Sequence, residues 1–246
     1  MPGFYIGPLF FHYYGLILGA AILAAFLTAK FFASRENLPQ EIVDTAAVIL
    51  IVPVVLGSRI YHVLHFWGYY SVNLVQIFYI WQGGIGIIGG ILAGGLTLYI
   101  FSGIRKLDFL KLADLASLVL VLGQSIGRIG NFINIEGFGP PTNLPWGVFV
   151  PQLKRPERFL NFSHFHPTFF YESLGDFLIF LILVFLPAKK PGTKFAAYLI
   201  LYSTLRAGLE FLRIDTWQFG IVKVAQLIAV FGFLAGIAIL FRTRKI

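Results

Sequence analysis

Residues 84–101 read GIGIIGGILAGGLTLYIF and contain no charged side chain. A stretch of this length and composition predicts a helix that crosses the roughly 30 Å hydrocarbon layer of a bilayer. Its glycines could imitate a nucleotide-binding loop, but no strand precedes them, so we reject that function. Comparable apolar stretches recur along the chain, at residues 14–33, 42–66, 112–130, 168–186, 195–212 and 222–241.

The composition of the whole chain supports the same class. Its 246 residues are 58% hydrophobic and 12% charged, whereas a soluble domain carries about 25% charged residues. Backbone within the hydrocarbon layer must pair its own N–H and C=O groups, which makes helices the economical structure for these stretches. We therefore predict an all-α, polytopic membrane protein with seven transmembrane helices, folded as a single membrane-embedded domain over residues 1–246.

The distribution of charge predicts the orientation of the chain. The net charge of +8 could suggest a nucleic-acid partner. However, most basic residues lie in short segments between the apolar stretches or at the C-terminus, where they set orientation, and we expect no nucleic acid. The positive-inside rule places the N-terminus outside and the C-terminus in the cytoplasm. Residues 131–165, rich in proline, glycine and aromatic residues, would then form a small extracytoplasmic cap.

Ionisable residues within the predicted spans indicate a functional site. A charged side chain there costs about 2.5–3.5 kcal/mol on insertion scales, and such residues usually face a cavity or a partner. Arg206, Glu210 and Arg213 are spaced i, i+4 and i+7 and share one helix face. Two arginines around one glutamate leave surplus positive charge, which suits an anionic ligand. A purely structural ion pair is the alternative.

Two further groups of polar residues lie in or beside the spans. Arg128 and Asn131 share a face if the fourth predicted helix continues past residue 130. A planar guanidinium with amide donors nearby suits a phosphate group, although an interfacial arginine that reaches for water is the alternative. On the second span, Arg59 is followed by His62 and His65, which are otherwise typical of packing or interfacial positions.

Residues 127–139 read GRIGNFINIEGFG and resemble the hallmark motif of the prolipoprotein diacylglyceryl transferases. The resemblance continues, in order and spacing, over nearly the whole chain. Further matches are Tyr14-Gly15, Gly57-Ser58-Arg59, His166-Pro167-Thr168, Tyr171-Glu172, Arg206, Glu210-Phe211, Arg213 and Gln226. One position departs from the pattern, because Ile88 stands where many members carry a histidine that is a candidate base.

The resemblance implies an enzyme of the bacterial plasma (inner) membrane. Such an enzyme transfers the diacylglyceryl group of phosphatidylglycerol to the lipobox cysteine of a prolipoprotein. The reaction forms a thioether, releases glycerol phosphate and is the first step of lipoprotein maturation. The implied partners are phosphatidylglycerol, the prolipoprotein signal peptide and membrane lipids. Cysteine is absent and no metal-binding spacing occurs, so we expect neither a metal nor a cofactor.

This chemistry suggests roles for the polar residues. The leaving phosphate needs stabilisation, which arginines in a low-dielectric cavity can supply. With Ile88 in place of histidine, the same cationic pocket should favour the thiolate, with His62 or His65 as alternative bases. The predicted catalytic residues are Arg128, Arg206 and Glu210, the last as a base only if its arginines leave it free. The predicted substrate-binding residues are Tyr14, Arg59, Asn131, Asn134, Glu136, Gly139, His166 and Arg213.

Two other classes of protein fit part of the pattern. A transporter or flippase for an anionic lipid would also need buried arginines and closely packed helices. Its polar groups would gather near the bilayer midplane, whereas Arg128, Asn131 and Glu136 are predicted toward the outer leaflet. A structural scaffold of a membrane complex would explain none of the charge within the spans.

Overall fold

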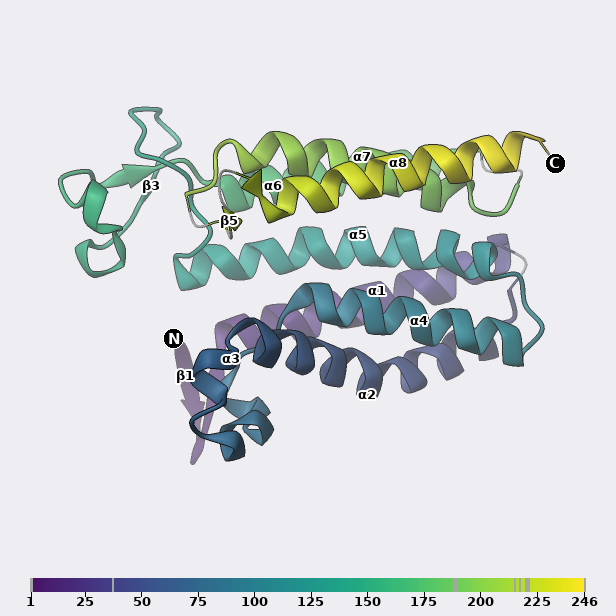
Figure 1. Ribbon diagram of the computed structural model, residues 1–246, viewed down its shortest axis with the longest axis horizontal. Coiled ribbons are helices and arrows are strands. Elements are labelled where there is room, and N and C mark those ends of the chain that lie inside the picture. Colours follow the sequence, from purple (N-terminus) through teal and green to yellow (C-terminus); the bar gives the residue numbers. More distant parts are fainter. Residues whose placement is uncertain are drawn as a thin grey trace. The chain divides into compact units, whose positions relative to one another are not determined.

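The computed structural model of the protein describes residues 2–36, 38–187, 190–214, 216, 218–219 and 222–245. Long helices dominate these parts of the chain (Figure 1). They are α1 (Tyr13–Ala33), α2 (Gln40–His65), α4 (Ile87–Ile104), α5 (Phe109–Asn134), α6 (Thr168–Phe185), α7 (Thr193–Glu210) and α8 (Val224–Lys245). Shorter helical turns are η1 (Ser34–Glu36), α3 (Trp67–Tyr70), η2 (Leu74–Phe78), η3 (Ile80–Gln82), η4 (Gln152–Lys154) and η5 (Glu157–Phe159).

Short antiparallel strand pairs precede α1 and lie in two of the segments between helices in the described ranges. Each hairpin has two strands and none extends into a larger sheet. The pairs are β1 (Gly3–Ile6) with β2 (Leu9–His12), β3 (Val148–Phe149) with β4 (His164–Phe165), and β5 (Gln218–Phe219) with β6 (Val222–Lys223). Since these strands are two to four residues long and the long helices make up most of the described chain, the predicted all-α class is confirmed.

The spans α1, α2, α4, α5, α6 and α8 are, within the described residues, long and apolar enough to cross a membrane. This result confirms an all-α polytopic membrane protein. α7 occupies the place of the predicted sixth span but is more polar, because it carries Lys194, Arg206 and Glu210 within its 18 residues. The count of seven spans and their orientation therefore stay predictions.

Several helix ends differ from the sequence expectation by three or four residues, and two of them lie beside predicted site residues or the glycines that precede α4. α5 continues to Asn134, past the expected end at residue 130. α4 begins at Ile87, later than residue 84. The delay has a backbone cause, because Gly83 and Gly84 adopt left-handed φ angles of 91° and 74°, which no helix accommodates. Apolar composition alone could not reveal either end.

The chain divides into two compact units. Unit one comprises Met1–Ala29 and Asp114–Ile246, and unit two comprises Lys30–Ala113. In unit two, α2 packs tightly on α4, because a Cβ on Gly57 would lie only 2.6 Å from the carbonyl oxygen of Gly89. In unit one, α7 packs between α6 and α8, which run alongside it in Figure 1. The single-domain organisation stays a prediction.

The segment expected to form a cap has a small apolar core of its own. Phe138, Val150 and Phe165 are buried together in it. Arg155 closes the segment by donating hydrogen bonds to the carbonyl oxygens of Val150 and Leu160. Because α5 takes up the first residues of the predicted segment, its non-helical part begins only after Asn134.

Candidate functional site

Glu172, on the second turn of α6, binds two arginines in unit one. Only 1% of its surface is exposed. Its Oε1 accepts a hydrogen bond from Nη2 of Arg128 at 2.5 Å, and its Oε2 accepts one from Nη1 of Arg213 at 3.4 Å. One buried carboxylate therefore joins α5, α6 and the segment that follows α7.

A second ion pair lies on α7. Nη1 of Arg206 and Oε2 of Glu210 are 2.7 Å apart, although the two groups are not aligned as a hydrogen bond. Glu210 is fully buried, and its backbone carbonyl accepts a hydrogen bond from Nζ of Lys223 at 2.6 Å. Glu210 was a candidate base only if its neighbouring arginines left it free, and Arg206 forms an ion pair with it.

We call Arg128, Arg206, Arg213, Glu172 and Glu210 the arginine cluster. Burial lowers the pKa of Arg213, and the charges of Arg206 and Arg128 lower it further, because three cations share a small volume. The surplus positive charge expected from α7 alone is reduced by Glu172, which the sequence-based site did not include. Three guanidinium groups still face two carboxylates within the cluster. Asp176 adds a third carboxyl group beside Arg128 and Arg206, and Lys223, which donates to the backbone carbonyls of Glu210 and Arg213, adds a fourth cation, so that cations outnumber carboxyl groups.

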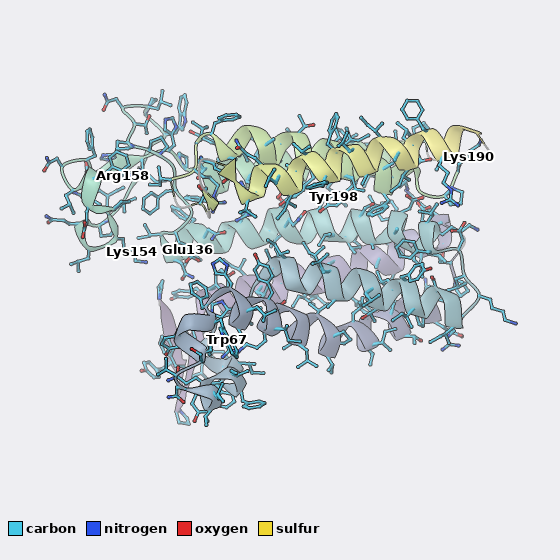
Figure 2. The ribbon with its side chains drawn as sticks, in the orientation of Figure 1. Trp67, Glu136, Lys154, Arg158, Lys190 and Tyr198 are labelled. Carbon is cyan, nitrogen blue, oxygen red and sulfur yellow. The ribbon has the colours of Figure 1, made fainter. Side chains whose placement is uncertain are left out.

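The end of α5 carries three of the predicted substrate-binding residues. Nδ2 of Asn131 and Nδ2 of Asn134 lie 3.4 and 3.2 Å from Oε1 of Glu136. Because the helix runs to Asn134, Arg128 and Asn131 share a face, as predicted for a continuing helix. Figure 2 shows Glu136 at this end of α5, with Lys154 of the predicted cap nearby, and Lys154 donates a hydrogen bond to the carbonyl oxygen of Asn134.

The turn after α5 brings this end to the arginine cluster. Ile135 and Gly137 both have left-handed φ angles, of 50° and 68°. A Cβ on Gly137 would lie 3.8 Å from Nη2 of Arg213 and 3.8 Å from Nδ2 of Asn131. The amide of Asn131 and the guanidinium of Arg213 therefore flank the same short stretch of backbone.

Gly139 and His166 are brought together through the backbone. The N–H of Gly139 donates to the carbonyl oxygen of His166 at 2.8 Å. A Cβ on Gly139 would lie 2.6 Å from the carbonyl oxygen of Leu212, so this close approach needs glycine. Nδ1 of His166 lies 3.3 Å from the hydroxyl of Tyr171, which also accepts a hydrogen bond from Nε1 of Trp146. These contacts suit residues that shape the site.

The two remaining predicted residues lie in different units. Tyr14 of unit one packs on α5, because a Cβ on Gly130 would lie 2.7 Å from its ring. Arg59 belongs to unit two, where its guanidinium donates to four backbone carbonyls among the described residues. Tyr14 therefore lies beside the helix that carries Arg128 and Asn131. Arg59 instead binds the backbone of its own unit.

Sequence reasoning left Glu172 out of the site. A signal for it was present, because Glu172 and Asp176 are spaced i, i+4 within an apolar stretch. Carboxylates there need cations, and Arg128 and Arg213 supply them for Glu172. Asp176 is also fully buried, and neither of its carboxylate oxygens has a hydrogen-bond partner among the described residues.

Comparison with known proteins gives a consistent result. A family model described as prolipoprotein diacylglyceryl transferase matches residues 3–242. A protein of Nostoc sp. is 39% identical over 241 residues, which cover 95% of this chain and 85% of that protein. One from Acaryochloris marina is 40% identical over 233 residues, covering 93% and 85%. One from Finegoldia magna is 38% identical over 236 residues, covering 95% and 91%.

All three relatives are named phosphatidylglycerol–prolipoprotein diacylglyceryl transferase. The match extends over nearly the whole chain, and its range contains the positions of the arginine cluster. It also agrees with the resemblance of residues 127–139, GRIGNFINIEGFG, which include the last turns of α5 and the turn after it. The chain belongs to the prolipoprotein diacylglyceryl transferase family.

Proposed function

We propose that the arginine cluster binds the phosphate of phosphatidylglycerol and that the diacylglyceryl group is transferred beside it to a lipobox cysteine. The chain is a transferase of lipoprotein maturation, as its family and its relatives' shared name indicate. One observation carries the assignment of the site. Arg128, Arg206 and Arg213 converge in unit one and are held there by buried carboxylates.

The reaction places specific demands on this site. The cysteine sulfur forms a bond to the terminal glycerol carbon of the diacylglyceryl group. The bond between that carbon and the phosphate oxygen breaks, and glycerol phosphate leaves with the bonding electrons. Guanidinium donors fixed in a low-dielectric site stabilise the charge that develops on the phosphate. Arg128 and Arg206 fill this role in our proposal, and the cationic surroundings favour release of the thiol proton to solvent.

The carboxylates act on the arginines and not on the substrate in this proposal. Glu172 fixes the guanidinium groups of Arg128 and Arg213, and Glu210 fixes that of Arg206. The amide of Asn131, next to Arg213, is placed to orient the glycerol head group. In this proposal Glu210 is a positioning residue and not the base, because it forms an ion pair with Arg206.

The membrane setting follows from the helices and from the proposed reaction. The protein is embedded in a membrane, and we propose the bacterial plasma (inner) membrane with the predicted cap on the outer face. α7 would be the sixth of seven spans. Its charged residues do not exclude this, because Arg206 and Glu210 form an ion pair and paired charges are less costly in lipid.

A direct assay tests the proposed function. Purified protein, phosphatidylglycerol vesicles and a lipobox peptide should yield a peptide whose mass has increased by one diacylglyceryl group. Mass spectrometry of the peptide measures the product. A Cys→Ser peptide should gain no mass, since the thiolate is the attacking group. An unmodified Cys peptide, under conditions in which a relative is active, would refute the proposal.

A second prediction concerns the missing histidine. His62 packs on the rings of Phe66 and Tyr70, and His65 stacks on Tyr61, all within unit two. These contacts suit packing residues. We therefore expect the double variant His62→Ala, His65→Ala to keep most of its activity, with a rate that rises with thiol ionisation between about pH 6 and 9.

The pH–rate profile of that double variant decides between the two models. If either histidine were the general base, its removal would reduce the rate by about 10²–10⁴-fold. A loss of that size, with binding of phosphatidylglycerol unchanged, would identify a histidine as the base and exclude activation by the cationic pocket.

A further inference from the structure

Residues 66–86 join α2 to α4 and have an unusual composition for a connecting segment. They contain no aspartate, glutamate, lysine, arginine or histidine. Connecting segments that face water are normally polar and charged. This one instead carries the aromatic residues Phe66, Trp67, Tyr69, Tyr70, Phe78, Tyr79 and Trp81. We call residues 66–86 the aromatic connector.

Many rings of the aromatic connector point away from the protein. Trp67 is 51% exposed, and Phe78 and Trp81 are each 74% exposed. Figure 2 shows Trp67 at the end of unit two where the connector lies. Large exposed apolar patches on a protein mark interaction surfaces. Tryptophan and tyrosine in particular are enriched where the lipid head groups meet the acyl chains.

The backbone of the connector is held by a buried arginine. Arg59, on α2, is only 6% exposed. Its Nε donates to the carbonyl oxygen of Ile77 at 2.8 Å, and its Nη2 donates to that of Gln76 at 2.5 Å. Its Nη1 donates to the carbonyl oxygens of Gly83 and Gly84, at 2.8 and 3.0 Å. The guanidinium also lies 5.1 Å from the ring centroid of Tyr70.

Backbone carbonyls need hydrogen-bond donors from the protein wherever water cannot reach them. Short helical turns such as η2 and η3 leave carbonyl groups without partners inside the turn. In water such groups are solvated, but within lipid each unsatisfied group costs several kcal/mol. Here one guanidinium donates to four carbonyl groups of the connector, two in η2 (Gln76 and Ile77) and two after η3 (Gly83 and Gly84). The carbonyl of Gln76 also accepts a hydrogen bond from the N–H of Tyr79. An irregular segment whose carbonyls accept hydrogen bonds from a buried side chain of the neighbouring helix suits a lipid environment.

The glycine pair at the end of the connector makes this arrangement possible. Gly84 has a φ of 74°, and a Cβ on it would lie 2.6 Å from Nη1 of Arg59. Gly83 also has a left-handed φ, of 91°, but nothing lies within 4 Å of its Cβ position. The absence of a side chain at Gly84 therefore lets its carbonyl reach Arg59.

We propose that the aromatic connector lies in the boundary between head groups and acyl chains of the bilayer, with Arg59 as the residue that holds it there. Both ends of the connector continue directly into spans, α2 and α4, so it starts and ends at the membrane surface. Its lack of charge and its exposed rings fit lipid as the partner. Arg59 is thus a positioning residue, in place of the substrate contact expected from sequence. This inference does not rest on the proposed transfer chemistry.

Tryptophan fluorescence tests the location of the connector. The chain has four tryptophans. Two single-tryptophan proteins would retain either Trp81 or Trp67, with the others replaced by phenylalanine. In vesicles whose lipids carry bromine high on the acyl chains, both should lose most of their emission, while iodide in the water should quench them little. Strong quenching by iodide, or no quenching by brominated lipid, would overturn the proposal.

Variants of the Trp81 protein test the role of Arg59. Arg59→Lys keeps the charge but lacks the planar fork that serves four carbonyls, and Gly84→Ala displaces the guanidinium. Both should increase quenching of Trp81 by iodide and decrease quenching by brominated lipid. The control Gly83→Ala also places a side chain at a residue of positive φ, but no atom lies within 4 Å of that Cβ position, so it should change both less. Quenching of Arg59→Lys identical to that of the parent would refute the role of Arg59.

Discussion

The Arg128→Ala and Arg206→Ala proteins should each lose transfer activity by about 10²–10³-fold in kcat, the usual cost of removing one preorganised donor to a developing oxyanion. Arg128 approaches this position from α5, and Arg206 from α7. Each guanidinium would bind the departing phosphate of phosphatidylglycerol. Initial rates of peptide lipidation, measured by mass spectrometry at saturating lipid, give the effect on kcat.

Two sets of controls separate lost chemistry from lost folding. Alanine leaves Glu172 or Glu210 as a buried unpaired carboxylate, and breaking a buried pair costs about 3–5 kcal/mol. Arg128→Lys and Arg206→Lys keep the charge and should stay folded, yet should still be slow, because an ammonium lacks the bidentate fork. Arg105→Ala, at an exposed arginine, should be normal. Near-normal rates in both alanine variants would exclude the arginines from phosphate binding.

The fold was predictable because the properties that determine it are local. A span such as α2 or α4 is recognised from a run of apolar residues alone. The ends of α4 and α5 were not, because they depend on the left-handed backbone of Gly83 and on the turn that follows Asn134. Apolar composition carries little information about backbone torsion angles. The positions of the helices were therefore predicted better than their ends.

The contacts of the site also differ in whether local sequence spacing predicts them. The pair of Arg206 and Glu210 follows from i, i+4 spacing on one helix, and the structure shows it. The contacts of Glu172 join residues from separate elements, and no spacing rule reports them. The case of Arg59 is harder still, because its partners are backbone carbonyls, which have no sequence signature. Arg59 was predicted to bind substrate from its place within a span, and the pattern gave no sign of its hydrogen bonds to the carbonyls of the segment that follows α2.

The second large effect is expected at Glu172. Its carboxylate sets the position of both Arg128 and Arg213, at 2.5 and 3.4 Å. Glu172→Gln keeps the shape and one acceptor but removes the charge that holds two cations together. A displacement of about 1 Å in a catalytic group can reduce the rate by roughly 10²-fold, and we expect a loss of that order in kcat. Glu172→Ala should lose more, because Arg128 and Arg213 would then repel each other without a counter-charge.

The comparison that decides the role of Glu172 is between rate and stability. If the carboxylate only stabilises the fold, Glu172→Gln should lower the midpoint of thermal unfolding while each folded molecule keeps its kcat. If it positions the arginines, kcat should fall in protein that is fully folded at the assay temperature. Glu157→Ala, at an exposed carboxylate of the predicted cap, is the matched control and should change neither quantity. A Glu172→Gln protein with normal kcat would show that Arg128 and Arg213 keep their positions without it, so that the phosphate site does not depend on this ion pair.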